Sequence, residues 1–256
     1  MDMLYDMHCH LDFAEGSEGV ARASHAAGIV ALSCTVVPSS YVSDVEKFQG
    51  CDDIHLSLGL HPWWIADRRV SEVDIARFES LVADAPFVGE IGLDLASSRK
   101  DTKARQIEVL ERILASVHAA GDGRVLTFHA VHAASVLMDA LDRNGTNEAN
   151  TCLFHWFQGS HEEFGRALSM EAMMSVGMRM MATERGAAFA AAIPEAQLLV
   201  ETDSPPHEGS SWDVGIWTQE MTNTITALAE LRGCSRAHLM EVCAQNSERV
   251  LRTPFM

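Results

Sequence analysis

Short apolar runs alternate with longer segments of helical period along the whole chain. Eight of these runs predict β-strands, over Leu4–Met7, Val30–Thr35, His55–Gly59, Phe87–Ile91, Val125–Phe128, Thr151–Phe154, Ala172–Val176 and Gln197–Val200. Between them, apolar residues recur at i, i+3 and i+4, which predicts helices over Ser71–Asp84, Thr102–Ala119, His132–Arg143, Ser160–Leu168 and Ala182–Ala192. Two further helices are expected to close the chain, over about Gly215–Leu231 and Ser235–Leu251. Such an alternation predicts parallel β/α units.

Repeated β/α units form either a closed barrel or an open, doubly wound sheet. The chain has neither the G-x-G-x-x-G pattern nor the P-loop pattern that would favour a nucleotide-binding open sheet. Instead, histidines and carboxylates fall at the carboxyl ends of the predicted strands, where the reaction face of a TIM barrel forms. No linker divides the 256 residues. We therefore predict a single-domain α/β protein, a TIM-type (β/α)8 barrel over residues 1–256.

The first predicted strand runs into His8-Cys9-His10. Side chains two residues apart in an extended segment lie on the same face, so both imidazoles can reach one ion. A lone H-x-H is a weak indication, because histidines are also common at surfaces. Ligand-type residues at four other predicted strands strengthen it, namely Glu90, His129, His155 and Asp203.

Glu90 lies in an apolar run, between Val88-Gly89 and Ile91. A buried carboxylate without a partner costs several kcal/mol, and a carboxylate can bridge two cations. The sequence therefore indicates two divalent metal ions. Imidazole and carboxylate ligands suit zinc first, and manganese or magnesium are the alternatives.

The residues also match a known family. The segments concerned are MHCHLDF, GLHPWW, VGEIGLD, LTFHA, LFHWFQGS, LLVETDSPP and the closing QNSERVL. In this order they resemble the TatD-like hydrolases of the metal-dependent amidohydrolase superfamily, from Asp6 to Leu251. The resemblance implies a TIM barrel with two divalent metals and deoxyribonuclease or related phosphodiesterase activity.

The resemblance also implies a role for each site residue. His8 and His10 resemble the ligands of one metal, with Asp203, and His129 and His155 resemble those of the second. Glu90 resembles the bridge between them. Glu90 and Asp203 are thus the expected catalytic residues, with Asp203 orienting the attacking water or accepting its proton.

Two positions depart from the family pattern. The arginine that usually follows two residues after the strand-five histidine is replaced by Val131, and the usual basic stretch after Asp203 is replaced by HEGSSWDVGIW. Both changes remove positive charge that would hold phosphate. The residues that could replace this charge are His132, His161 and Arg99.

Each of the other candidate polar and aromatic residues has two possible roles. His61, His132 and Trp63 are candidates for substrate contact. The alternatives are a turn histidine, a surface histidine and a packed lid residue. Asp94 and Glu201 are candidates for orienting the metal-binding histidines through the ring nitrogen that does not bind metal. The alternative for Asp94 is a helix cap, and the alternative for Glu201 is a salt-bridged carboxylate in the core.

The formal net charge of −17 argues against tight, nonspecific DNA binding but not against phosphodiester chemistry. We therefore expect a two-metal phosphodiesterase acting on DNA or a small phosphodiester. The alternatives are hydrolysis of a small cyclic amide, ester or phosphoester, and a non-catalytic metal-binding scaffold. The amino-terminal segment does not resemble a signal peptide and no apolar run reaches membrane-spanning length, so we expect a cytoplasmic protein. The sequence indicates no protein partner.

Overall fold

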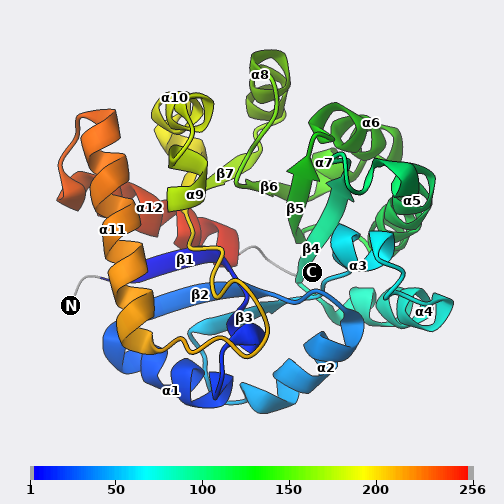
Figure 1. Ribbon diagram of the computed structural model, residues 1–256, viewed down its shortest axis with the longest axis horizontal. Helices are drawn as coiled ribbons and strands as arrows, with labels where there is room; N and C mark the ends of the chain where they lie inside the picture. Colours follow the sequence, from blue (N-terminus) through cyan, green and yellow to red (C-terminus); the bar gives the residue numbers. More distant parts are fainter. Residues whose placement is uncertain (1–2, 253–256) are drawn as a thin grey trace.

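The computed structural model describes residues 3–252 and has the predicted barrel (Figure 1). Each predicted apolar run contains a strand, and the boundaries differ by a few residues. The strands are β1 (Leu4–Cys9), β2 (Ile29–Cys34), β3 (Ile54–Ser57), β4 (Phe87–Asp94), β5 (Val125–Val131), β6 (Thr151–His155), β7 (Met173–Val176) and β8 (Leu198–Val200). β1, β4 and β5 extend beyond their predicted ends, so that His8, Asp94 and His129 lie within strands.

The strands pair in sequence order and all in parallel. One ladder joins β1, β2 and β3, and a second joins β4 through β8. The two ladders meet between β3 and β4 at a bridge from Leu58 to Val88, where the Leu58 amide donates to the Phe87 carbonyl at 3.0 Å. The ring of strands in Figure 1 therefore continues across this seam.

The seam between β8 and β1 is closed beyond the end of β8. The backbone amide of Asp203 donates to the carbonyl of His8 at 2.9 Å. The buried carboxylate of Asp6 accepts from the backbone amide of Thr202 at 3.0 Å, from the Thr202 hydroxyl at 2.6 Å and from the Trp217 indole at 2.8 Å. Asp6 thus connects β1, the segment after β8 and a covering helix through one side chain.

Helices surround the ring of strands on its outside (Figure 1). Their bounds are α1 (Ser17–Ala27), α2 (Pro38–Lys47), α3 (Pro62–Ala66), α4 (Glu72–Leu81), α5 (Lys103–Ala119), α6 (Ala134–Asn144), α7 (Thr146–Ala149), α8 (His161–Ser169), α9 (Met178–Met181), α10 (Glu184–Ala192), α11 (Val214–Arg232) and α12 (Arg236–Leu251). No helix among residues 3–252 is long and apolar enough to cross a membrane.

Local sequence explains where several helices begin. α4 and α8 both start with a capping box, in which a serine hydroxyl accepts from the third helical amide and an acidic side chain accepts from the serine amide. The serines are Ser71 and Ser160. The apolar face of each long helix packs against the strands; on α5, Leu110, Ile113 and Val117 are buried. These elements hold the carboxyl ends of the strands in a fixed ring.

Candidate metal centre

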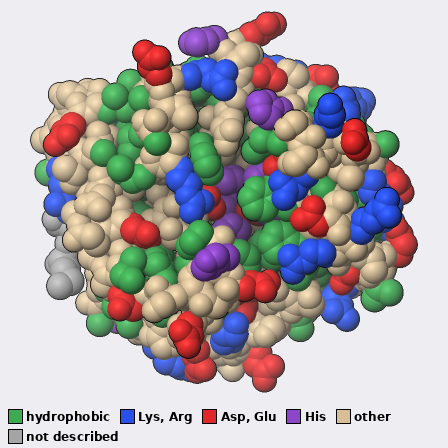
Figure 2. Space-filling model, in the orientation of Figure 1, with side chains coloured by type: hydrophobic (Ala, Val, Ile, Leu, Met, Phe, Trp, Pro, Cys, Tyr) green, Lys and Arg blue, Asp and Glu red, His purple; other side chains and the backbone are tan. Residues whose placement is uncertain are grey.

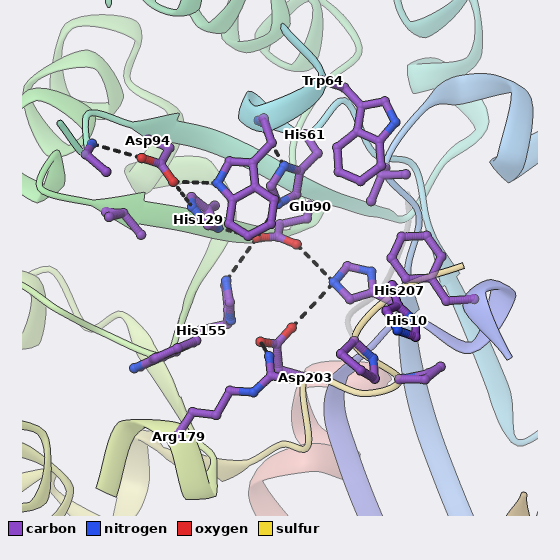
Figure 3. Close-up of a pocket in the computed structure, with 18 of the residues that line it drawn as sticks. His10, His61, Trp64, Glu90, Asp94, His129, His155, Arg179, Asp203 and His207 are labelled. Carbon is purple, nitrogen blue, oxygen red and sulfur yellow. Dashed lines mark hydrogen bonds and ion pairs between the residues drawn. The ribbon is translucent and has the colours of Figure 1, made fainter. Parts of the chain in front are cut away.

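Glu90 lies at the centre of the polar cluster at the mouth of the barrel. Its carboxylate is buried, with 1% of the residue exposed. Oε2 lies 3.3 Å from Nε2 of both His8 and His10. Oε1 lies 2.7 Å from Nδ1 of His129 and 2.9 Å from Nε2 of His155. The two oxygens therefore face two different sets of imidazoles, which is the arrangement of a bridging carboxylate (Figure 3).

Asp203 completes the set that faces Oε2 of Glu90. Its Oδ1 lies 3.5 Å from Nε2 of His10 and 3.9 Å from Nε2 of His8. The backbone bonds between the ends of β1 and β8 hold it there, and His10 donates its amide to the carbonyl of Ser204 at 2.8 Å. Asp203 has a φ of 53°, in the left-handed region that costs free energy for a non-glycine residue. Strain of this kind is often found at functional sites.

The hydrogen bond that Nδ1 of His10 makes determines which nitrogen of the ring carries the proton. Nδ1 of His10 lies 2.8 Å from the carbonyl oxygen of Cys34, which can only accept. In the neutral ring Nδ1 therefore carries the proton, and the lone pair of Nε2 faces Glu90 and Asp203. His8 is held in a similar way, with Nδ1 3.2 Å from the hydroxyl of Thr127 and Nε2 directed inward.

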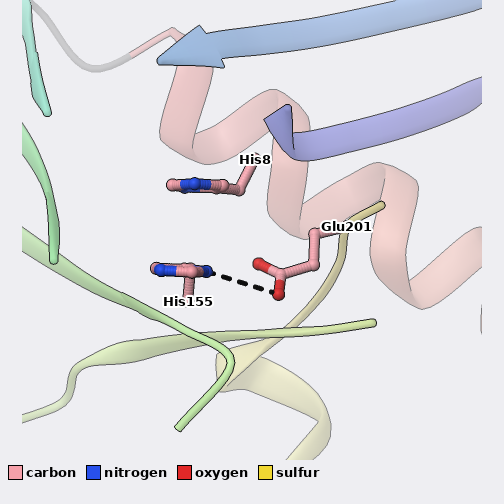
Figure 4. A group of neighbouring side chains, drawn as sticks. All are labelled: His8, His155 and Glu201. Atoms are coloured by element: carbon pink, nitrogen blue, oxygen red, sulfur yellow. Dashed lines mark ion pairs between the residues drawn. The ribbon is translucent and has the colours of Figure 1, made fainter. Parts of the chain in front are cut away.

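His129 and His155 have carboxylates behind them. Nε2 of His129 lies 3.2 Å from Oδ2 of Asp94, so its Nδ1 lone pair faces Glu90. Nδ1 of His155 lies 3.6 Å from Oε1 of Glu201, which is close but beyond hydrogen-bond distance (Figure 4). Nε2 of His155 faces Glu90. A carboxylate behind a histidine orients the ring and increases its basicity as a metal ligand.

His61 shows the opposite arrangement. Its Nδ1 accepts from the backbone amide of Trp63 at 3.0 Å and so caps helix α3. The Nδ1 lone pair is therefore occupied, and in the neutral ring Nε2 carries the proton, 3.1 Å from Oε1 of Glu90. Burial lowers the pKa of His61 to about 4. His61 is thus a neutral hydrogen-bond donor that faces the centre.

The carboxylates and histidines determine one another's charge. Burial alone would raise the pKa of Glu90, but the surrounding histidines, His61 and His155 above all, outweigh it and hold that pKa well below its ordinary value. At Asp203, burial raises the pKa, but the hydrogen bond from His10 and the charge of the neighbouring histidines outweigh it, so the pKa of Asp203 is lowered. Burial of the His10 ring lowers its pKa, but Asp203 and Glu90 outweigh this and raise it to about 10. Both carboxylates are anionic at neutral pH.

The donor set fits a pair of divalent ions. Ligand atoms of His8, His10 and Asp203 lie within 4.8 Å of one another, as do those of His61, Glu90 and His129. A third set of this kind joins His8, His155 and Glu201, where Glu201 faces the outer nitrogen of His155. Nε2 of His8 and Oε2 of Glu90 are buried and lack hydrogen-bond partners among the described residues. Buried polar atoms are normally satisfied, so these two atoms indicate a ligand position between them.

The centre lies at the bottom of a cavity of about 740 Å³, a size typical of small-molecule sites. Trp63 and Trp64 of α3 form one wall. The guanidinium groups of Arg99 and Arg69 stack on them, each 4.5 Å from a ring centroid. Arg179 of α9 lies on another part of the lining. Figure 2 shows histidines in the hollow, with basic and hydrophobic side chains around its rim.

The structure places most of the sequence-predicted residues at this cavity. The lining includes nine of them, His10, His61, Trp63, Glu90, Asp94, Arg99, His129, His155 and Asp203. His8 and Glu201 lie beneath it, buried.

His132 and His161 are exposed and are not part of the lining. They therefore do not supply the positive charge missing at Val131, which does line the cavity. Arg179 and Arg69 line the cavity but were not among the sequence candidates. Neither lies in one of the sequence segments that carry the family resemblance.

Comparison with known proteins agrees with this geometry. A family model described as TatD related DNase matches residues 5–252. An uncharacterized metal-dependent hydrolase of Haemophilus influenzae is 22% identical over 258 residues, which cover 98% of this chain and 100% of the relative. Among solved structures, a TatD homologue of Escherichia coli has a TM-score of 0.80 at 22% identity and covers 98% of both chains.

A more distant structure shares the fold. The phosphotriesterase homology protein of Escherichia coli, solved with phosphate in its active site, has a TM-score of 0.62 at 13% identity, covering 96% of this chain and 98% of that one. At this identity the similarity shows the barrel alone. The family model spans nearly the whole chain, and on that match this protein belongs to the TatD related DNase family.

Proposed function

We propose that this protein is a two-metal hydrolase that cleaves phosphodiester bonds. The observation that carries the proposal is the position of Glu90, whose two oxygens face two separate sets of imidazoles. The family name supports phosphoryl chemistry.

The chain would divide its ligands between two positions. His8, His10 and Asp203 would hold one ion, His129 and His155 the other, and Glu90 both. Zinc is the expected metal, since imidazole predominates, with manganese or magnesium as alternatives. The metal pair would supply charge that stabilises the transition state and makes a water acidic near neutral pH.

The chain's own groups would then move the protons. Asp203 is ionised at neutral pH, because its pKa is lowered, and its carboxylate lines the cavity, where it would orient the attacking water and accept its proton. His61 would donate its Nε2 proton in a hydrogen bond to a substrate oxygen, because its Nδ1 is already occupied. Asp94 and Glu201 would keep His129 and His155 in the orientation that ligation needs. Trp63 would contact the substrate from the side wall of the cavity.

A second candidate function keeps the centre but changes the substrate to a small cyclic amide, ester or phosphoester. The cavity of about 740 Å³ matches a small ligand, and the net charge of −17 opposes the approach of a long polyanion. DNA remains the first substrate to test, because the family model names it.

The test replaces the bridging carboxylate. Glu90→Gln keeps the side-chain shape but removes the anion between the two ions, so we expect loss of at least one of about two bound metals. Metal content by elemental analysis and turnover of bis(p-nitrophenyl) phosphate and of an oligonucleotide are measured on the same sample. We expect turnover to fall roughly a hundredfold or more, which corresponds to about 2.7 kcal/mol or more in the barrier.

Glu162→Gln is the matched control, because Glu162 is exposed on α8, outside the cavity lining. It should keep both metals and full turnover. Full turnover in Glu90→Gln would refute the bridging role. Metal binding without phosphodiester turnover in the wild type would favour the small-substrate alternative, for which amide and ester substrates are then screened.

A further inference from the structure

Arg179 reaches the centre from an element that the sequence pattern did not predict. It is the second residue of α9, the four-residue helix after β7. Its Nη1 lies 2.6 Å from Oδ2 of Asp203, and its guanidinium lies 5.9 Å from the ring centroid of Trp156. In Figure 3 its side chain points toward Asp203 from the side of the cavity opposite Trp64.

The two oxygens of Asp203 have different neighbours. Oδ1 faces His10 and His8, the ligand set of the first position, while Oδ2 faces Arg179. The Asp203 side chain is 13% exposed and that of Arg179 is 43% exposed. An anion that approaches Asp203 and its ligand set from the cavity would therefore meet the guanidinium group beside them.

The exposure of Arg179 argues against a purely structural ion pair. The Arg179 side of the pair is open to solvent, and an ion pair that solvent reaches contributes little to stability. A guanidinium offers five donors in a planar fork that matches phosphate, and Nη1 of Arg179 donates one hydrogen bond to Asp203. Arg179 lines the cavity, so its other donors are available to a ligand there.

Among the described residues that line the cavity, three are arginines and none is a lysine. Val131, two residues after His129, lines the same cavity but offers no charge. The other lining arginines, Arg69 and Arg99, are stacked on the tryptophans of α3. Arg179 is the lining arginine whose guanidinium contacts a proposed metal ligand.

We propose that Arg179 is the anion-binding residue of this site and holds the phosphoryl oxygens of the substrate against the metal centre. This role deepens the proposed function and rests on it. The substrate class is therefore a phosphoester whose phosphoryl group reaches the floor of the cavity between Asp203 and Trp156.

The experiment measures binding of inorganic phosphate to the metal-loaded protein by calorimetry, with metal content measured in parallel. Arg179→Met removes the fork and keeps much of the apolar stem. A hydrogen bond to a charged group is worth about 1.5–3 kcal/mol, so the dissociation constant for phosphate should rise roughly tenfold to a hundredfold. Arg179→Lys keeps the charge without the fork and should show an intermediate loss. Metal content should not change.

Arg143→Met is the matched control, because Arg143 is also exposed and paired with a carboxylate, Glu111, but lies on the outer helices. It should bind phosphate like the wild type. Phosphate binding that is unchanged in Arg179→Met would overturn the proposal. So would loss of metal in that variant, since Arg179 would then act by positioning Asp203.

A second probe, acetate, tests the chemistry of the anion. If acetate but not phosphate binds in an Arg179-dependent manner, the phosphoryl assignment is wrong. Failure of the proposed function looks different: phosphate would bind and depend on Arg179, while no phosphodiester would be turned over. That result would support the anion-binding role of Arg179 and refute only the proposed phosphodiester hydrolysis.

Discussion

At the scale of single residues, the histidines of the cluster differ in which nitrogen is engaged on the outer side. Nδ1 of His10 donates a hydrogen bond to a carbonyl, and Nε2 of His129 faces Asp94, so in the neutral rings the opposite nitrogens would offer lone pairs to a metal. His61 engages Nδ1 as an acceptor and presents a proton instead. Side chains of one chemical type therefore take two roles, as ligand and as donor.

Proton release should accompany metal binding, because metal-free His10 holds both protons at neutral pH. Its pKa is raised to about 10 by Asp203 and Glu90, against the effect of burial. An ion needs the Nε2 lone pair and must displace that proton. Below a pKa of about 10 the metal-free form binds more protons than the metal-bound form, so affinity should rise with pH, by up to about tenfold per pH unit for each proton released.

Calorimetry of manganese binding, in buffers of different ionisation enthalpy, would count the released protons at each pH. The count should be about one or more per chain at pH 7, and smaller for His10→Ala. An affinity that stays flat from about pH 6 to pH 8, with no dependence on the buffer, would mean that His10 is already neutral.

Sequence alone identified the ligand-type residues but not these roles. His8, Glu90 and Asp203 stand out because they interrupt or end apolar runs. Which nitrogen of His61 is free depends on the amide of Trp63 in a helix of only five residues. Neither the bond nor the helix has a periodic pattern that a sequence could show.

At the scale of elements, hydrophobic period made the strands and most of the long helices predictable. α1 and α2 were not among the predicted helices although they have 11 and 10 residues, and the shortest helices show no period. α5 and α11 repeat their apolar face over several turns, and both were predicted within a few residues. α3 and α9 are one turn each, too short for a hydrophobic period. They carry Trp63, Trp64 and Arg179, so the elements that shape the cavity wall were the least predictable part of the fold.

The seam between β1 and β8 should depend on Asp6. Four donors converge on its carboxylate, from Thr202 twice, from Trp217 and from the His8 amide. Asp6→Asn would set an amide group against some of these donors inside the core. Leaving buried donors unsatisfied costs about 1–3 kcal/mol, and we expect the free energy of unfolding to fall by about 2 kcal/mol.

Urea unfolding of the metal-free protein measures this change without contributions from metal binding. Asp139→Asn serves as the control, because Asp139 pairs with Arg166 on the exposed outer helices and should matter by less than about 1 kcal/mol. Equal stability of wild type and Asp6→Asn would show that the backbone bonds alone close the seam.

At the scale of the whole molecule, charge is distributed unevenly. The chain carries a formal net charge of −17, yet three arginines line the cavity. The net charge follows from composition, whereas the arginines reach the cavity from three separate segments, after α3, after β4 and in α9. The net charge would therefore repel a phosphoester at long range, and the arginines and the proposed metal ions would attract it only inside the cavity, where carboxylates also lie.

This distribution predicts an unusual salt dependence for cleavage of an oligonucleotide. Nucleases with a basic surface lose affinity steeply as salt rises, because salt competes with their phosphate contacts. Here the long-range term is repulsive, and raising ionic strength from about 0.01 M to 0.1 M shortens the screening length from about 30 Å to 10 Å. The kcat/KM for a single-stranded oligonucleotide should therefore stay constant or rise severalfold over this range. That of bis(p-nitrophenyl) phosphate, with a single charge, should change little. A steep fall for the oligonucleotide would reveal a basic track that outweighs the net charge, and would place the protein with nucleases that hold long DNA.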